Sequence, residues 1–173
     1  LSGDDEGLRE IIDLYHDGLI LYLNSIVQNI HTAEDLAEET LAVLVIKQPK
    51  FSGKSSFKTW LYAIARNTAR MYLRKHSVQI CVPDEISEDI VSSDNVEERL
   101  LRSEENKLIY NSLKSINSEY GQVIYLSYFE NLSNEETAVI MKKTRRQIES
   151  LLYNAKKALK INLERSGFEY GKP

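Results

Sequence analysis

A chain of 173 residues with 42% hydrophobic side chains can bury one medium core or two small ones, which excludes a disordered chain. Only 7 Gly and 3 Pro favour helices over a turn-rich β architecture, and a single cysteine excludes an internal disulfide or a cysteine-rich zinc site. A net charge of −4 argues against a general nucleic-acid coat. No apolar run approaches the roughly 18 to 20 residues of a membrane span. Since no signal peptide is visible either, we expect a cytoplasmic protein without membrane insertion.

The first half of the chain predicts three helices. Apolar side chains recur at three- and four-residue spacing over 8–29. Thr32 is expected to cap a second helix over 33–47, which ends before a proline. A third helix is predicted over 57–75, so that residues 8–76 would form one bundle.

The third predicted helix has one apolar and one cationic face. Arg66, Arg70 and Arg74 recur every four residues and therefore stack along one side. Residues 50–75 carry seven basic residues and no acid. This face suits a polyanion backbone, although a solvated charged surface is the plainer interpretation. The same periodicity places Met71 on the buried face.

The second half reads as a linker followed by a second helical unit. Residues 77–94 are polar and acidic, which is typical of a linker. The helical period resumes over 96–116, and a short helix is expected over 118–130.

Residues 133–160 have the form of a helix-turn-helix. Ser133 and Glu136 form a predicted capping box, a break follows, and Thr144 is expected to cap the last helix. Its outward positions carry side chains that can reach base edges or phosphates: Arg145, Arg146, Gln147, Ser150, Tyr153, Asn154, Lys156 and Lys157. Helix–helix corners are also common in helical proteins without DNA ligands.

Charge is strongly segregated along the chain. Residues 1–39 carry −9 and residues 76–105 carry −7, whereas residues 50–75 carry +7 and residues 142–160 carry +6. We therefore predict that acidic segments fold against the basic faces and that the free protein binds DNA poorly.

The order of AEDLAEETL, FKTWLYAIARN and LSNEETAVIM, followed by TRRQIESLLYNAKKAL, resembles an extracytoplasmic-function (ECF) sigma factor of bacterial RNA polymerase. The resemblance extends from about Leu8 to Leu163. It implies an all-α fold with two small helical domains joined by an acidic linker. The implied parts are a region-2-like bundle at 8–76, the linker at 77–94, a region-4-like helix-turn-helix domain at 95–163 and a tail at 164–173.

The resemblance also implies three binding surfaces and no catalytic residue, metal or cofactor. Core polymerase, through the clamp of its largest subunit, would contact Asp35, Leu36, Glu38, Glu39 and Leu41. The −10 element would contact Phe51, Ser52, Lys54, Lys58, Tyr62, Arg66, Asn67, Arg70 and Arg74. The −35 element would contact Thr144 together with the outward positions of the last helix named above. An anti-sigma factor is a further implied partner.

The sequence departs from the family pattern at several positions. Glu38 replaces a usual Gln, and Lys142 and Lys143 occupy a turn that usually contains Gly. A Lys in the left-handed conformation costs on the order of 1 kcal/mol. Glu149 and Leu151 replace basic residues, which predicts weaker −35 binding with a smaller salt dependence.

Two other function classes remain open at this point. A stand-alone helix-turn-helix regulator would bind duplex DNA without polymerase, usually as a dimer. A helical interaction module would use its basic faces on acidic partners. An enzyme is least expected, because the chain contains no nucleophile–base set, metal-ligand spacing or phosphate-binding Gly loop.

Overall fold

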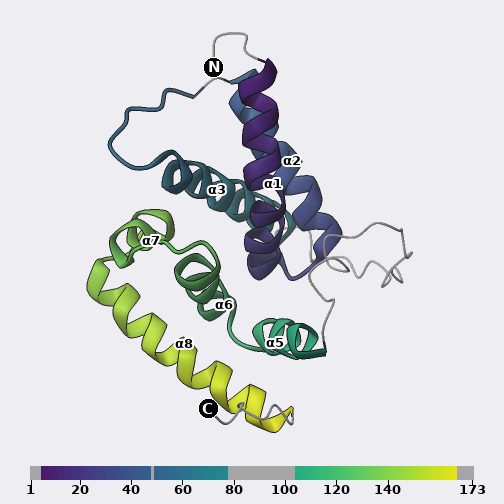
Figure 1. Cartoon of the computed structure of the whole chain (residues 1–173), viewed down its shortest axis with the longest axis vertical. Helices are drawn as coiled ribbons and strands as arrows, with labels where there is room; N and C mark the ends of the chain where they lie inside the picture. The colour runs from purple at the N-terminus through teal and green to yellow at the C-terminus, as the bar shows by residue number, and fades with distance from the viewer. Residues whose placement is uncertain (1–4, 48, 78–103, 167–173) are drawn as a thin grey trace.

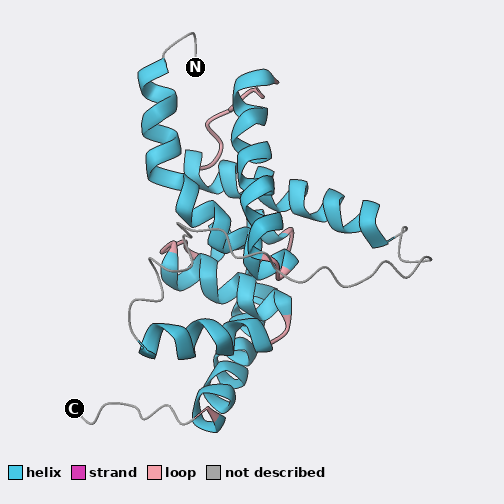
Figure 2. Ribbon diagram, turned by 90° about the vertical axis from the view of Figure 1, so that its right-hand side faces the viewer, coloured by secondary structure: helices cyan, strands magenta, loops and turns pink. Residues whose placement is uncertain are grey.

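The computed structural model describes residues 5–47, 49–77 and 104–166, which Figure 1 shows as coloured ribbon. Every regular element in these ranges is helical (Figure 2), and the predicted all-α class is confirmed. The predicted linker at 77–94 lies outside the described residues except for Ser77, the last residue of α3. The start of the helix predicted over 96–116 is outside them too.

Three helices form the N-terminal unit: α1 (Asp5–Val27), α2 (Ile30–Ile46) and α3 (Phe57–Ser77). The short connection after α1 places α2 beside it, and α3 packs on both helices (Figure 1). The apolar faces enclose a core that includes Leu19, Leu23, Leu36, Leu44, Leu61 and Ala65. The three helices therefore share one apolar core.

The start of α2 differs from the prediction. Gln28 has a left-handed backbone with φ 57°, which reverses the chain directly after α1. Asn29 is then the N-cap, and its side chain accepts a 2.9 Å hydrogen bond from the backbone amide of Thr32. Thr32 lies inside the first turn, so its prediction as the cap was wrong. Both residue types are good N-caps, and the early reversal of the chain selects the earlier one.

The described part of the C-terminal unit consists of α5 (Glu104–Ser115), α6 (Ser118–Ile124), the π-helical turn η1 (Tyr125–Phe129), α7 (Asn134–Met141) and α8 (Arg145–Arg165). The single helix predicted over 118–130 is thus α6 continued by a π-turn, in which Glu130 N–H donates to the carbonyl of Tyr125. The α8 helix packs along α5, α6 and α7 with Ile148 and Ala155 buried.

The two units pack directly against each other. Contacts join α3 to α7 and join α1 to α6 and η1 (Figure 1). Their interiors merge into one cluster, in which the Tyr22 ring lies 5.3 Å from Tyr62 and 6.2 Å from Tyr125. Consequently α3 is covered on two sides, by α1 and α2 on one and by the C-terminal unit on the other.

Candidate nucleic-acid interface

The helix-turn-helix is built by two reciprocal caps. Ser133 accepts a hydrogen bond from the backbone amide of Glu136, whose carboxylate accepts one from the Ser133 amide over 3.0 Å. Thr144 and Gln147 repeat this arrangement at the start of α8. Between the helices Lys142 adopts the left-handed conformation, with φ 53° and ψ 48°. The predicted caps and the predicted left-handed lysine are confirmed.

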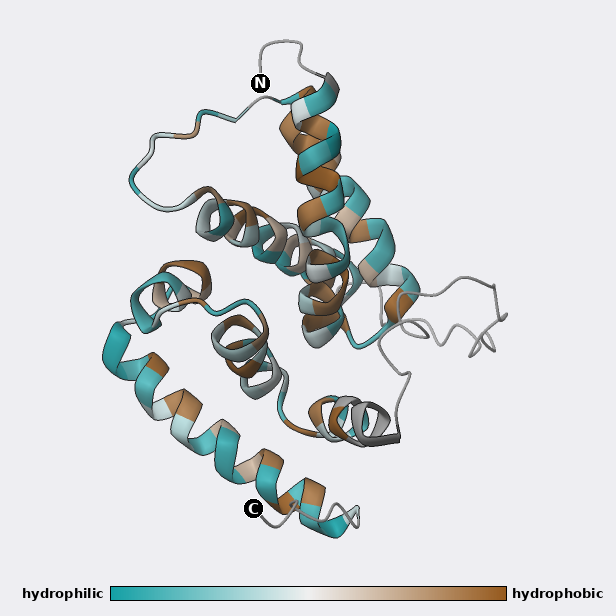
Figure 3. Cartoon of the chain, viewed as in Figure 1, coloured by the Kyte–Doolittle hydropathy of each residue, from teal (hydrophilic) through white to brown (hydrophobic). Residues whose placement is uncertain are grey.

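The outer face of α8 is uniformly polar and open. Figure 3 shows hydrophobic residues on the side of α8 that faces the other helices and hydrophilic residues on the side turned away. All eight outward positions predicted from the sequence are exposed: Arg145, Arg146, Gln147, Ser150, Tyr153, Asn154, Lys156 and Lys157. These side chains supply enough hydrogen-bond donors to contact base edges in a major groove.

The basic residues of α8 are not electrostatically equivalent. Arg145 forms ion pairs with Glu135 at 2.6 Å and with Glu149 at 2.8 Å. The hydrogen bond to Glu149 and the charge of Glu135 raise the Arg145 pKa. Lys156 lies over the ring of Tyr128, with its Nζ 5.1 Å from the centroid. Arg146, by contrast, forms no ion pair with the described part of the chain, so its charge is available to a phosphate.

The cationic face predicted for α3 is divided in two. Arg70 and Arg74 are exposed, as are Phe51, Ser52 and Lys54 in the preceding loop, and Asn67 is half-buried. Lys58, Tyr62 and Arg66 instead face the C-terminal unit. Tyr62 and Arg66 are buried there, and Lys58 is partly buried.

The predicted burial of Met71 was wrong, because its side chain is 55% exposed. Helical periodicity found the face of α3 that packs on α1 and α2. The C-terminal unit covers a second face further toward the start of α3, where Thr59 and Arg66 are buried. Met71 lies beyond that cover, on the last turns of the helix.

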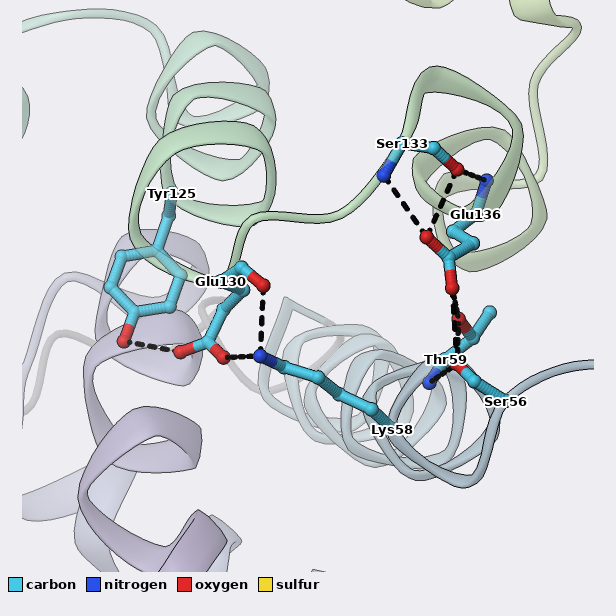
Figure 4. A network of polar contacts seen from close by, with 7 residues as sticks. All are labelled: Ser56, Lys58, Thr59, Tyr125, Glu130, Ser133 and Glu136. Atoms are coloured by element: carbon cyan, nitrogen blue, oxygen red, sulfur yellow. Dashed lines mark hydrogen bonds and ion pairs between the residues drawn. The ribbon is translucent and has the colours of Figure 1, made fainter.

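Lys58 is held by a glutamate of the C-terminal unit (Figure 4). Its Nζ lies 2.7 Å from Oε2 of Glu130 and donates to the Glu130 backbone carbonyl over 2.8 Å. The hydroxyl of Tyr125 donates to Oε1 of the same carboxylate over 3.0 Å. Burial, and then the Glu130 charge, raise the pKa of Tyr62 and of Tyr125. Both hydroxyls therefore stay protonated.

Arg66 is buried with a neutral partner. Only 5% of the residue is exposed, and Nε donates to Oε1 of Gln122 over 3.3 Å. Its Nη1 atom is buried without a hydrogen-bond partner among the described residues. Burial lowers the Arg66 pKa, but a guanidinium remains protonated in proteins. Sequence reasoning missed Gln122 and Glu130, since no local pattern connects them with residues more than 50 positions away.

The loop before α3 carries an aromatic ring at the surface. Phe51 is 44% exposed and packs 5.9 Å from Phe57 and 5.3 Å from Trp60, measured between ring centroids. The ring of Tyr15 in α1 also packs on Phe57, with 5.8 Å between the centroids. A supported, half-exposed ring beside cationic side chains can stack with an unpaired base.

The five residues of α2 predicted to form a binding surface are divided between the surface and the core. Asp35, Glu38 and Glu39 are exposed on one side of the helix. Leu36 and Leu41, which belong to the same predicted set, are 3% and 6% exposed and lie in the core. A partner docking on this side of α2 would therefore meet the three carboxylates.

Neither a metal site nor a membrane span is found in the described ranges. No group of three His, Cys, Asp or Glu side chains there is placed to hold a metal ion. None of the helices described is both long and apolar enough to cross a bilayer.

Two family models match the chain. The model of Sigma-70 region 2 matches residues 11–78, and that of Sigma-70 region 4 matches residues 107–159. The two matches together span more than two thirds of the chain. They correspond to the N-terminal and C-terminal helical units described above.

Relatives of known function match over nearly their whole length. RNA polymerase sigma factor YlaC of Bacillus subtilis (strain 168) is 26% identical over 163 residues, which cover 93% of this chain and 94% of YlaC. ECF RNA polymerase sigma factor SigM of the same organism is 26% identical over 153 residues, covering 88% of this chain and 93% of SigM.

Solved structures show the same fold. Sigma factor RpoE from Bartonella quintana, crystallised with the anti-sigma factor NepR, gives a TM-score of 0.71 at 21% identity and covers 92% of this chain and 98% of its own. CnrH, in complex with the cytosolic domain of CnrY, gives 0.66 at 16% identity, covering 95% and 92%. The chain belongs to the sigma-70 family as an ECF-type RNA polymerase sigma factor, which directs promoter-specific transcription initiation. The family predicted from the sequence motifs is confirmed.

Proposed function

We propose that this sigma factor divides promoter recognition between two cationic surfaces and uses an acidic surface to bind polymerase. The observation that carries the proposal is that one chain presents all three on separate helices. Arg70 and Arg74 of α3 and the first turns of α8 are exposed and basic, while Asp35, Glu38 and Glu39 of α2 are exposed and acidic. Each surface has the charge that its partner requires.

The N-terminal unit would read single-stranded −10 DNA. The half-exposed Phe51 ring gives a stacking surface for a flipped base, and Lys54 beside it can meet a phosphate. Arg70 and Arg74 continue this cationic path along α3. Lys58, Tyr62, Arg66 and Asn67 belong to the proposed path once the C-terminal unit has moved away.

The C-terminal unit would read the −35 element with α8. The capped turn positions Thr144 and the first turn of α8 for insertion into a major groove. Arg146 would supply a phosphate contact, and Ser150 and Asn154 can reach base edges. Arg145 is neutralised by two glutamates, so we propose that −35 binding is weak compared with a fully basic helix.

The acidic face of α2 would dock on the clamp of the largest polymerase subunit. The chain would act in the cytoplasm and would contribute no catalytic step of its own. By analogy with RpoE, which was solved with the anti-sigma factor NepR, an anti-sigma factor is a proposed partner.

The direct test is run-off transcription with purified bacterial core polymerase on a pool of genomic promoters from the source organism. Transcripts that depend on this chain, with mapped starts, would support the proposal and define both promoter elements. The absence of both transcripts and comigration with core polymerase on gel filtration would favour a stand-alone regulator. Comigration without transcripts would direct attention to an activator that α8 requires.

A further inference from the structure

The contact between the two units uses the residues proposed to bind DNA. Polar contacts across it join Lys58 to Glu130 and Arg66 to Gln122. The Tyr62 side chain is fully buried in the same contact. In this arrangement, three of the proposed −10 residues face the C-terminal unit and are covered by it.

Glu130 is held in place more firmly than a surface carboxylate. Its side chain is 11% exposed, and each oxygen has a partner, Lys58 on one and Tyr125 on the other. The π-turn precedes it and Asn131, with φ 52°, follows it, so the local backbone aims the carboxylate at α3. Figure 4 shows this carboxylate lying between Tyr125 and Lys58.

The close approach at Glu130 depends on a glycine of α1. A Cβ atom added at Gly18 would lie 2.6 Å from the Tyr62 hydroxyl and 2.8 Å from Oε1 of Glu130. Both distances are too short for any side chain. A methyl group at Gly18 would therefore push against Tyr62, within the N-terminal unit, and against Glu130 of the C-terminal unit.

The contact is electrostatically unequal along its length. At Lys58 the positive charge meets a carboxylate. At Arg66 it meets only the amide of Gln122, and Nη1 remains buried without a partner among the described residues. A buried guanidinium is better satisfied by an anion than by a neutral amide. A phosphate would therefore give Arg66 the anionic hydrogen-bond partner that the C-terminal unit does not supply at this position.

We propose that Glu130 closes the free chain by occupying Lys58, so that this lysine binds either the C-terminal unit or a nucleic-acid phosphate, never both. Closure is thus a direct competition between one carboxylate and a polyanion for the same face of α3. The inference rests on the proposed function only in naming that face as a −10 surface.

Two variants should weaken the contact at Glu130: one removes its charge, and the other crowds both Glu130 and Tyr62. Glu130→Gln keeps the shape of the side chain and removes its charge. Gly18→Ala inserts the methyl group described above, and alanine favours the helical state of α1. Their matched controls are Glu164→Gln, the same charge change at the exposed end of α8, and Gly121→Ala, whose Cβ would meet no atom closer than 3.7 Å.

Small-angle X-ray scattering of the full chain measures closure, and fluorescence anisotropy with a labelled oligothymidylate measures access to α3. We expect a larger radius of gyration for both opening variants and roughly tenfold tighter oligonucleotide binding, with neither control changed. Circular dichroism with unchanged helicity shows that each variant is folded. Lys58→Ala in the Glu130→Gln background should remove most of the gained affinity.

Three results would overturn the proposal. Opening variants that scatter like the wild type would show that Glu130 does not close the chain. Expanded variants with unchanged oligonucleotide affinity would show that closure does not mask α3. A wild type that is already expanded would show that the contact is absent in solution. Failure of the sigma assignment is separate, since it would appear as absent run-off transcripts while the scattering changes persist.

Discussion

The hydroxyl of buried Thr59 donates a 3.1 Å hydrogen bond to the carboxylate of Glu136, the residue that also completes the capping box of α7. Ser56 donates to the same oxygen over 3.1 Å. One carboxylate therefore fixes both the start of α7 and the position of α7 on α3. The helix-turn-helix begins with a cap that is shared between the two units.

This shared cap predicts an acid-sensitive contribution to stability. The pKa of Glu136 is lowered in the folded chain, chiefly by the hydrogen bond from the Ser133 backbone. A lowered folded-state pKa means that the carboxylate stabilises the fold above its ordinary value of 4.5 and ceases to do so as the pH falls below it. Urea unfolding at a series of pH values should therefore show Glu136→Gln less stable than wild type near neutrality, with the curves converging in acid.

Glu164→Gln is the control for this titration, because its exposed carboxylate caps no helix. Its unfolding free energy should follow the wild type at every pH. A constant difference between Glu136→Gln and wild type down to acid pH would contradict the linkage.

Because the backbone of Lys142 is left-handed, replacement of this residue by glycine should stabilise the fold. Glycine adopts φ 53° without the roughly 1 kcal/mol cost of a Cβ atom, although it gains freedom in the unfolded chain. We expect Lys142→Gly to raise stability by about 0.5 kcal/mol and the melting temperature by about 1–2 °C. Asn131→Gly at φ 52° should gain less, since asparagine tolerates this conformation. Equal gains at both positions would mean that side-chain type does not matter there.

Removal of the negative charge of Glu149 should increase the affinity of α8 for DNA. Glu149→Gln releases Arg145 from one of its two partners and removes a negative charge from the outer face of α8. We expect several-fold tighter binding to a −35 duplex and a salt dependence steeper by about one phosphate contact. Anisotropy titrations over a range of salt concentrations measure both quantities. An unchanged salt slope would show that Arg145 stays away from the backbone.

Alanine substitutions at Arg66 and Arg70 should differ in their effect on stability and agree in their effect on promoter opening. Arg66→Ala leaves the Gln122 amide without its donor, and the free chain should lose about 1–3 kcal/mol of unfolding free energy. Arg70→Ala changes an exposed side chain and should leave stability within about 0.5 kcal/mol of wild type. Both substitutions should impair permanganate-detected promoter melting while core binding is retained. Loss of core binding in either variant would place that arginine on the polymerase side.

The acidic face of α2 predicts a selective loss of polymerase binding. Charge reversal at Glu38 and Glu39 leaves the buried side of α2 untouched, so helicity should not change. Affinity for core polymerase should fall by at least roughly tenfold, measured by competition with the unmodified chain. The control is Glu10→Lys on the exposed side of α1, which should bind core normally. Retained affinity in the double variant would move the polymerase surface elsewhere.

Helix caps and turns were predictable from the sequence where residues a few positions apart determine them. The caps at Ser133 and Thr144 follow from side chains three residues apart, and the unusual Lys142 turn follows from the missing glycine. The choice between Asn29 and Thr32 was not predictable in this way, because both residues can cap. It was decided by the reversal of the chain at Gln28.

The burial of Arg66 and Lys58 could not be predicted from periodicity. A helical pattern identifies one buried face of α3, whereas their partners Gln122 and Glu130 are more than 50 residues away in the chain. The prediction that the acidic segments 1–39 and 76–105 shield the basic faces is not confirmed at Lys58 of α3, because the carboxylate that pairs with Lys58 is Glu130, outside both segments. Residues 78–103, where most of the second segment lies, are outside the described residues.

The π-turn η1 makes the length of the chain between α6 and α7 a functional quantity. A π-turn contains one more residue in each hydrogen-bonded turn than an α-helix, so it takes up one extra residue within Tyr125–Phe129. The Glu130 amide closes this turn on the Tyr125 carbonyl, and the Glu130 carboxylate then meets Lys58. A chain one residue shorter in this turn would lose the hydrogen bond that closes it, and the proposed closure would lose the segment that places its carboxylate.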